Sequence, residues 1–293
     1  MNYDTSQGSL RVPITPMVRK IMVLNAGIYA VCVGACALKY SESIQWLTNN
    51  LYLNPDAVID GSSVWMLATY AWFHEIGQAP VLDLVVCAGV IYGFMRLYKS
   101  PWARQEPIMF WVVAFLAMML IGGIGFGAPL HLAGNLIGLY FFGHIFERRW
   151  GPRRFLIFWL LCTIAGGALE TLVHVYWSRG IVLGASAGVL GLLAAFSVYH
   201  PDDRVLYGMV LPIKGRHFIL IAVAFDLLSF LGNQGVAIFA HLGGILMGLL
   251  LTTGYWRPGK VLDKLQGGEK RRRANHLRIV PREDDDDPPP YLH

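Results

Sequence analysis

The sequence predicts an all-α polytopic membrane protein with about eight membrane-spanning helices. Three observations lead to this fold class. Hydrophobic residues make up 55% of the 293-residue chain and charged residues only 15%, which is outside the range of ordinary soluble domains. The apolar residues gather in runs that reach about 18 residues or nearly so, the length that crosses a bilayer as a helix. Short polar connectors separate these runs, and the basic residues cluster in alternate connectors.

The expected spans follow a polar N-terminal segment, 1–20. The first apolar run starts only after Arg19 and Lys20, so we expect a retained anchor rather than a cleaved signal. Segment 60–75 is amphipathic enough to lie at the membrane interface. The final segment, 255–293, is basic, then acidic and proline-rich, and is expected to be a disordered cytoplasmic tail. The spans are expected at 21–38, 81–98, 108–127, 130–146, 155–176, 183–199, 217–232 and 236–254.

The charges between the runs support an even number of spans. With eight spans, every cluster of Lys and Arg falls on one side of the membrane, and the opposite connectors hold only isolated bases. The positive-inside rule then places both termini in the cytoplasm. The net charge of +5 therefore reads as a topology signal, and no nucleic-acid partner is expected. The clusters are Arg11 with Arg19 and Lys20; Arg96, Lys99 and Arg104; Arg148, Arg149, Arg153 and Arg154; Arg204, Lys214 and Arg216; and Lys260, Lys264 and Lys270 to Arg273.

Polar side chains inside the spans are the candidates for function, because such residues are costly in a membrane. His131 and Asn135 are four residues apart, so they share one face of the fourth span, and both can donate hydrogen bonds. Taken alone, hydrogen bonding between helices explains this pair equally well.

A second candidate is Ser186, which lies in the G-x-S-x-G pattern between Gly184 and Gly188. This pattern often presents a nucleophilic serine. On its own, a packing role for the serine is the commoner explanation, since small residues let membrane helices approach closely.

The third candidate is His241, about one turn inside the outer end of the last span. Counting residues from each helix start puts Ser186 and His241 at similar shallow depths below the same surface. Gly184 with Gly188, and Gly244 with Gly248, have the spacing that lets two helices come close. The sequence therefore predicts a serine–histidine hydrogen bond, the pairing that a nucleophile and its base require.

As a set, these motifs resemble those of the rhomboid family of intramembrane serine proteases. The resemblance covers about residues 60–254 of a membrane domain expected at 21–254. It implies a six-helix bundle, to which an apolar hairpin at about 81–127 is added as an insertion. The matching pieces, in family order, are His131-x-x-x-Asn135 followed by FFGHIFERRWG, Gly184-x-Ser186-x-Gly188, and Ala240-His241-Leu-Gly-Gly244.

The resemblance implies roles for these residues. Ser186 would be the nucleophile and His241 the general base, and His131, Asn135 and the backbone N–H of Ser186 would form the oxyanion hole. The family cleaves transmembrane helices of other proteins near their outer ends and needs no metal or cofactor. We therefore expect transmembrane protein substrates, a water-filled cavity around these residues, and a multi-pass location in the lipid bilayer of a bacterial inner membrane.

The chain departs from the family pattern at three places. The insertion separates His74 from His131, so His74 is either displaced from the site or folds back to it. Met66 stands where many relatives carry Arg, which puts the usual packing of this loop in doubt. Ala187 stands where relatives usually carry Gly, a change of one methyl group.

The sequence also contains other ionisable residues in or near the spans, and it permits two other functions. Asp226, in the seventh span, is expected to be interhelical or cavity-facing rather than catalytic. Glu170 and His174 have the spacing of a metal pair, but a solvated or hydrogen-bonded helix end is the preferred interpretation. A non-catalytic relative that binds membrane helices is the main alternative function. A small-molecule transporter is the third, and it would hold Ser186 far from His241.

Overall fold

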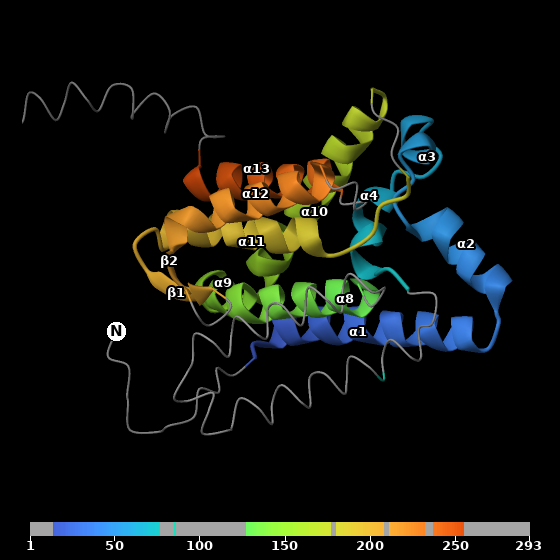
Figure 1. Cartoon of the computed structure of the whole chain (residues 1–293), viewed down its shortest axis with the longest axis horizontal. Coiled ribbons are helices and arrows are strands. Elements are labelled where there is room, and N and C mark those ends of the chain that lie inside the picture. Colours follow the sequence, from blue (N-terminus) through green and yellow to red (C-terminus); the bar gives the residue numbers. More distant parts are fainter. Residues whose placement is uncertain are drawn as a thin grey trace, which may run out of the picture. The chain divides into compact units, whose positions relative to one another are not determined.

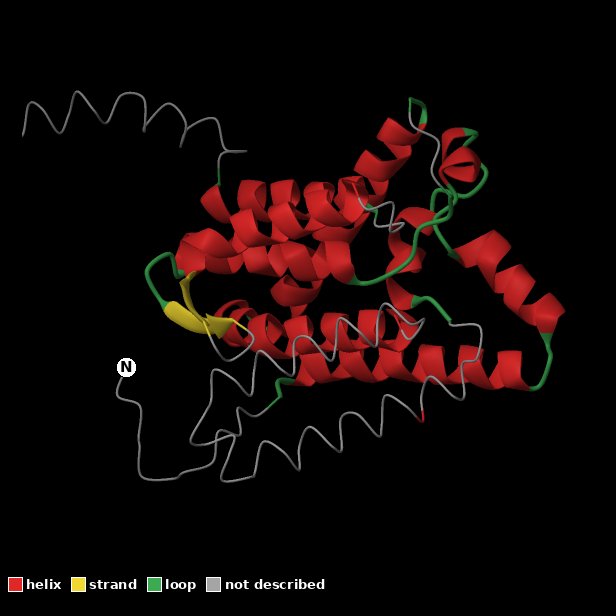
Figure 2. Cartoon of the chain, viewed as in Figure 1, coloured by secondary structure: helices red, strands yellow, loops and turns green. Residues whose placement is uncertain are grey.

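The residues that the structure describes are mostly helical, and they include a short antiparallel pair of strands that was not predicted (Figure 2). The chain divides into two units, Met1–Thr252 and Thr253–His293, of which the second contributes only Thr253 and Gly254 to the described residues. The structure, a computed structural model, describes residues 14–76, 85, 127–176, 180–207, 211–231 and 237–254. The elements are α1 (Pro16–Ala37), α2 (Ser41–Leu51), α3 (Pro55–Ile59), α4 (Met66–Thr69), η1 (Tyr70–Trp72), α8 (Gly127–Gly138), η3 (Leu139–Gly143), α9 (His144–Trp150), α10 (Pro152–His174), α11 (Ser186–Tyr199), β1 (Arg204–Tyr207), β2 (Leu211–Lys214), η4 (Gly215–His217), α12 (Phe218–Leu231) and α13 (Ile238–Thr253).

Helices occupy six of the eight expected spans. They are α1, the continuous run α8–η3–α9, α10, α11, α12 and α13. The π-helical turn η3 lies in the middle of the second of these. The expected spans 81–98 and 108–127 and the expected tail 255–293 lie almost wholly outside the described residues. The described residues thus form a mostly helical fold that is consistent with the expected class, while the count of eight spans stays a prediction.

The helices differ in length, and this places the candidate residues. Among the helices that the structure describes, α1 and α10 are long and apolar enough to cross a membrane by length and composition. α11 and α13 have 14 and 16 residues, which is about 21–24 Å of helix against about 30 Å of hydrocarbon. Such a helix can reach one surface while its other end stays within the bilayer. Ser186 and His241 lie in the first turns of these two helices.

The core of the fold surrounds α11, which is apolar on every face and packs against α10, α12 and α13 (Figure 1). A helix that is hydrophobic all round is buried on all sides. The ring of Phe196 on α11 contacts those of Phe142 and Phe218, which join η3 and α12 to this core. This central position fixes α11, and with it Ser186, against three neighbouring helices.

The segment between α1 and the insertion packs as a small layer beside the start of α11. Leu53 forms an antiparallel bridge with Val182, just before the serine motif. Met66, one of the departures from the family pattern, is fully buried with Tyr70 in an apolar cluster that also includes Ala240 of α13. An apolar side chain thus fills the place expected to hold Arg, and the loop is still packed.

Candidate active site

Ser186 and His241 lie in direct contact, as the sequence predicts. The Oγ atom of Ser186 is 2.7 Å from the Nε2 atom of His241, and both side chains are partly buried. The two residues belong to α11 and α13 and are 55 positions apart in the chain. This distance suits a hydrogen bond between a nucleophile and its base. The wide separation expected for a transporter is not observed.

The second ring nitrogen of His241 has a carboxylate partner, Asp226 of α12. Asp226 Oδ2 lies 2.9 Å from His241 Nδ1, and the Asp226 side chain is buried. An ionised carboxylate can only accept, and the tautomer that serves it carries the proton on Nδ1 and turns the lone pair of Nε2 toward the Ser186 hydroxyl. Asp226 is interhelical, as expected, but it lies against His241 in the position of a third triad member, the place that the sequence analysis disfavoured for it. The available signal was a single acidic residue in a 14-residue apolar helix.

Glycines on α13 allow the approach that brings His241 to Ser186. A Cβ atom on Gly248 would lie 2.5 Å from the carbonyl oxygen of Gly191, and one on Gly244 would overlap the backbone of Ala187. Backbone thus meets backbone between α13 and α11, as in other close helix pairs with small residues. Any side chain at either glycine would force the two helices apart.

The glycines on either side of the serine make other contacts than the sequence suggested. They were expected to face the helix of His241. Instead, a Cβ on Gly188 would overlap the indole ring of Trp159 on α10. One on Gly184 would lie 2.7 Å from a carbon of the His131 ring. Gly184 and Gly188 therefore do not face α13, which packs against a neighbouring face of α11.

His131 lies beside the serine, across Gly184. A Cβ atom on Gly184 would be 2.8 Å from His131 Nε2 and 3.7 Å from Ser186 Oγ. Gly184 has a φ of +121°, which L side chains rarely adopt. Glycine therefore keeps open the space between the imidazole and the hydroxyl. Ser186 is the first residue of α11, and amides at a helix start have no partner within the helix.

Asn135 is placed one turn beyond His131 but is directed elsewhere. Its side-chain amide donates to the backbone oxygen of His131 at 2.9 Å, and the side chain is buried. An amide has two N–H groups, and this bond uses one of them. Of the four predicted site residues, the structure brings three together, and the fourth braces the helix turn that carries His131.

His74 folds back to the site in spite of the insertion. Its ring centroid lies 5.2 Å from that of His131, and the side chain is only 2% exposed. His74 follows η1, outside the expected spans. Burial, and secondly the neighbouring His131 ring, lower the pKa of His74 from 6.5 to about 3. Neither ring nitrogen has a hydrogen-bond partner within the described part of the chain.

Glu170 and His174 form a hydrogen-bonded helix end, as expected. Glu170 Oε2 accepts from the backbone N–H of Ala240 at 2.9 Å. His174 Nε2 lies 3.3 Å from Asp56 Oδ1. Across the ranges that the structure describes, no group of three or more His, Cys, Asp or Glu residues is arranged to hold a metal ion.

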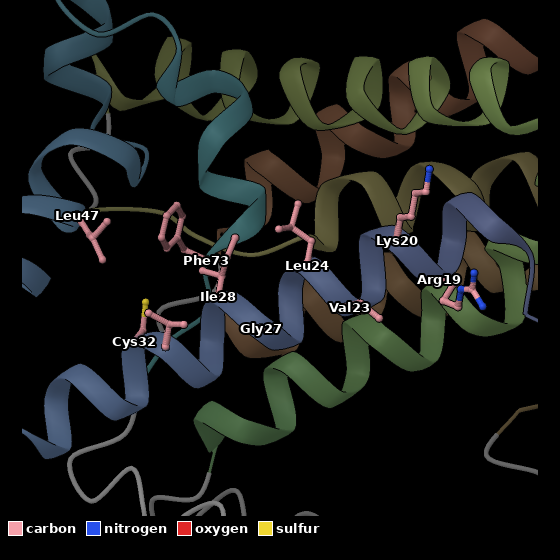
Figure 3. Close-up of a pocket in the computed structure, with 10 residues that line it drawn as sticks. Arg19, Lys20, Val23, Leu24, Gly27, Ile28, Cys32, Leu47 and Phe73 are labelled. Atoms are coloured by element: carbon pink, nitrogen blue, oxygen red, sulfur yellow. The ribbon is translucent and has the colours of Figure 1, made fainter.

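A groove of about 840 Å³ runs along α1 (Figure 3). It has Arg19 and Lys20 at one end and Leu47 with Phe73 near the other, with apolar side chains between. None of the four predicted site residues lines it. The water-filled cavity expected around Ser186 therefore stays a prediction.

Comparison with known families supports the assignment made from the motifs. A sequence model described as the Rhomboid domain matches residues 111–258, which is just over half of the chain and includes Ser186, Asp226 and His241. His74 lies before the matched region. The match thus covers the helices that carry the serine and the histidine.

Individual relatives are distant. RHOMBOID-like protein 12, mitochondrial, of Arabidopsis thaliana is 28% identical over 130 residues, 39% of this chain and 39% of the relative. Rhomboid protein 1, mitochondrial, of Saccharomyces cerevisiae is 30% identical over 46% of this chain and 39% of its own length. Rhomboid-like protease 3 of Toxoplasma gondii is 30% identical over 46% and 50%.

These relatives are matched over only part of their length. The chain spans about two fifths of the first two and half of the third. Two of the three are mitochondrial by name, so they lend no support to the expected bacterial inner membrane. An integral membrane location, by contrast, agrees with all of them.

Proposed function

The chain belongs to the rhomboid family, and from this premise we propose that it is an intramembrane serine endopeptidase. Its substrates would be transmembrane helices of other proteins, cut near one membrane surface. The observation that carries the proposal is the distance of 2.7 Å between Ser186 Oγ and His241 Nε2. A serine hydroxyl is a weak nucleophile until a base removes its proton, and this contact supplies the base.

In the proposed reaction His241 takes the Ser186 proton while Oγ attacks the peptide carbonyl. The C–N bond then breaks, the imidazolium returns the proton to the leaving amine, and the acyl group stays on the serine oxygen. Water, deprotonated by the same Nε2, attacks the ester, releases the new carboxyl terminus and restores the hydroxyl. Asp226 holds the imidazole in the required tautomer and stabilises its cationic form.

We assign the oxyanion site to the space beside Gly184. The His131 ring and the Ser186 hydroxyl lie beside this space. The His131 ring and the N–H of Ser186 would be the donors that stabilise charge developing on the attacked carbonyl. Asn135 remains a proposed donor through the second N–H of its amide. A substrate helix hides its carbonyls in its own hydrogen bonds, so we expect substrates whose helices unwind readily near the site.

We further propose that the protein crosses the membrane several times with both termini on one side. The support is that basic and base-poor connectors alternate along the chain. The six helices found at expected spans agree with this alternation. The N-terminal ends of α11 and α13, with Ser186 and His241, would then face the opposite, base-poor side. Cysteine accessibility on the two sides of sealed vesicles tests this orientation.

The decisive experiment is cleavage of a labelled transmembrane substrate by the full chain in liposomes. Ser186→Ala and His241→Ala should abolish cleavage. Ser197→Ala is the matched control, because Ser197 is a buried serine of the same helix whose hydroxyl bonds the Leu193 oxygen, and it should keep the parent's rate. A serine-reactive fluorophosphonate should label the parent but not Ser186→Ala. Undiminished cleavage by Ser186→Ala would reject the mechanism.

Absence of both cleavage and labelling in the parent, tested with several substrates, would favour the alternative function. The protein would then be a rhomboid relative that binds membrane helices without cutting them. We favour the enzyme, because this chain has a contact between the Ser186 hydroxyl and the His241 imidazole that a non-catalytic binding protein does not need.

A further inference from the structure

Glu170 holds the first turn of the helix that carries His241. Its Oε2 atom accepts a hydrogen bond of 2.9 Å from the backbone N–H of Ala240, the residue that precedes His241. The Glu170 side chain is only 3% exposed. Amides in the first turn of a helix have no partner within the helix, and the helix dipole favours an anion there. A hydrogen bond from backbone to side chain therefore joins α10 to α13 directly beside the histidine.

The carbonyl group of Ala240 is also in close contact with α10. A Cβ atom on Gly166, one turn before Glu170 on α10, would lie 2.6 Å from the carbonyl oxygen of Ala240. Ala240 is thus bonded through its N–H and in close contact through its C=O, both with α10. A buried carboxylate is costly inside a membrane protein, so a site that keeps one draws a specific benefit from its charge or its geometry.

We propose that Glu170 is a positioning residue that sets the distance between His241 and Ser186. This inference rests on the proposed peptidase function. Asp226 orients the imidazole ring of His241 through Nδ1, whereas Glu170 fixes the backbone from which that side chain projects. Without Glu170 the first turn of α13 can shift. A displacement of about 1 Å between reacting groups can cost about 100-fold in rate.

Two substitutions at Glu170 separate positioning from charge. Glu170→Gln keeps a carbonyl oxygen that can accept from Ala240, so kcat should stay within about fivefold of the parent. Glu170→Ala removes the acceptor, and kcat should fall about 10- to 100-fold while KM changes less than about twofold. The rate of fluorophosphonate labelling of Ser186 should fall in parallel with kcat. If Glu170→Ala does not fold, Glu170→Asp replaces it, with an expected loss of about tenfold.

Glu147 provides a matched control. It is likewise a buried carboxylate at a helix start, accepting from Met17 N and Val18 N of α1 at 2.8 Å each. Glu147→Ala should lower the melting temperature but leave kcat per folded molecule within about twofold of the parent, because its bonds fix α1 and not α13.

The outcomes are distinguishable. A parent protein with no Ser186-dependent cleavage or labelling overturns the peptidase proposal and this inference with it. An active parent whose Glu170→Ala variant keeps its kcat overturns the positioning role alone. The positioning role is also overturned if Glu147→Ala loses as much kcat per folded molecule as Glu170→Ala. The loss of kcat would then follow from removing any buried carboxylate that caps a helix.

Discussion

Asp226 Oδ2 lies 2.9 Å from Nδ1 of His241, on the side of the ring opposite to Ser186. Carboxylate, imidazole and hydroxyl thus form one chain of hydrogen bonds across α12, α13 and α11. The family resemblance implies a dyad of serine and histidine, so this third member is specific information from the structure. In the proposed mechanism it would fix the tautomer that a general base needs.

Asp226→Asn tests this role. The amide keeps the shape of the side chain but can donate to Nδ1, which would move the ring proton to Nε2 and leave no lone pair for the serine. We expect kcat to fall by about 10²–10⁴-fold with little change in KM, measured on the labelled substrate in liposomes. A variant with the parent's kcat and labelling rate would show that Ser186 and His241 suffice without the carboxylate.

Much of the site followed from sequence because its signals are local. The pairing of Ser186 with His241 was predicted from two motifs, each at a helix start, whose depths could be counted from the span boundaries. The six helices followed from apolar runs, which report on burial whatever the tertiary arrangement.

The remainder depends on how each helix is rotated about its axis, which apolar runs do not encode. Gly184 and Gly188 were assigned to the wrong neighbour for this reason. The partner of Asp226 lies on the next helix, and the bond depends on which face of α12 meets α13. For His74 the sequence left two outcomes open, displacement from the site or a return to His131, because its position depends on the path of a long insertion.

Gly184→Ala should remove activity by filling the space beside His131. The new methyl would lie 2.7–2.8 Å from the imidazole and would impose a side chain on a φ of +121°. Loss of one oxyanion donor costs about 10²–10³-fold in kcat, and we expect at least that much. Gly180→Ala is the control, since Gly180 is exposed and no described residue lies within 4 Å of the position of its Cβ. Equal kcat values for the two variants would contradict the proposed oxyanion site.

Gly248→Ala should push α13 away from α11. Its methyl would meet the backbone oxygen of Gly191 at 2.5 Å, and backbone cannot rotate away as a flexible side chain can. Overpacking of this kind costs about 1–3 kcal/mol of unfolding free energy, and kcat should fall with it because His241 moves with the helix. Thermal unfolding in detergent and substrate cleavage measure the two effects.

The control for that substitution is Gly27→Ala on α1. A Cβ there meets nothing within 4 Å among the described residues, and Ala is the better helix former by about 1 kcal/mol. Gly27→Ala should therefore be neutral or slightly stabilising. A Gly248→Ala variant as stable and active as Gly27→Ala would contradict the close contact between α13 and α11.

His74 should make the fold sensitive to acid. Its pKa is lowered to about 3 in the folded protein by burial and by His131, against an ordinary value of 6.5. Between these values the unfolded chain binds a proton that the folded chain does not, so the stability of the fold decreases as the pH falls below about 6.5. His74→Phe fills the same buried space without titrating and should lose part of this decrease. His217→Phe, at an exposed position, should retain all of it. Melting temperatures at about pH 7.5 and about pH 4.5 provide the comparison, and an equal drop in the parent and His74→Phe would refute the assignment.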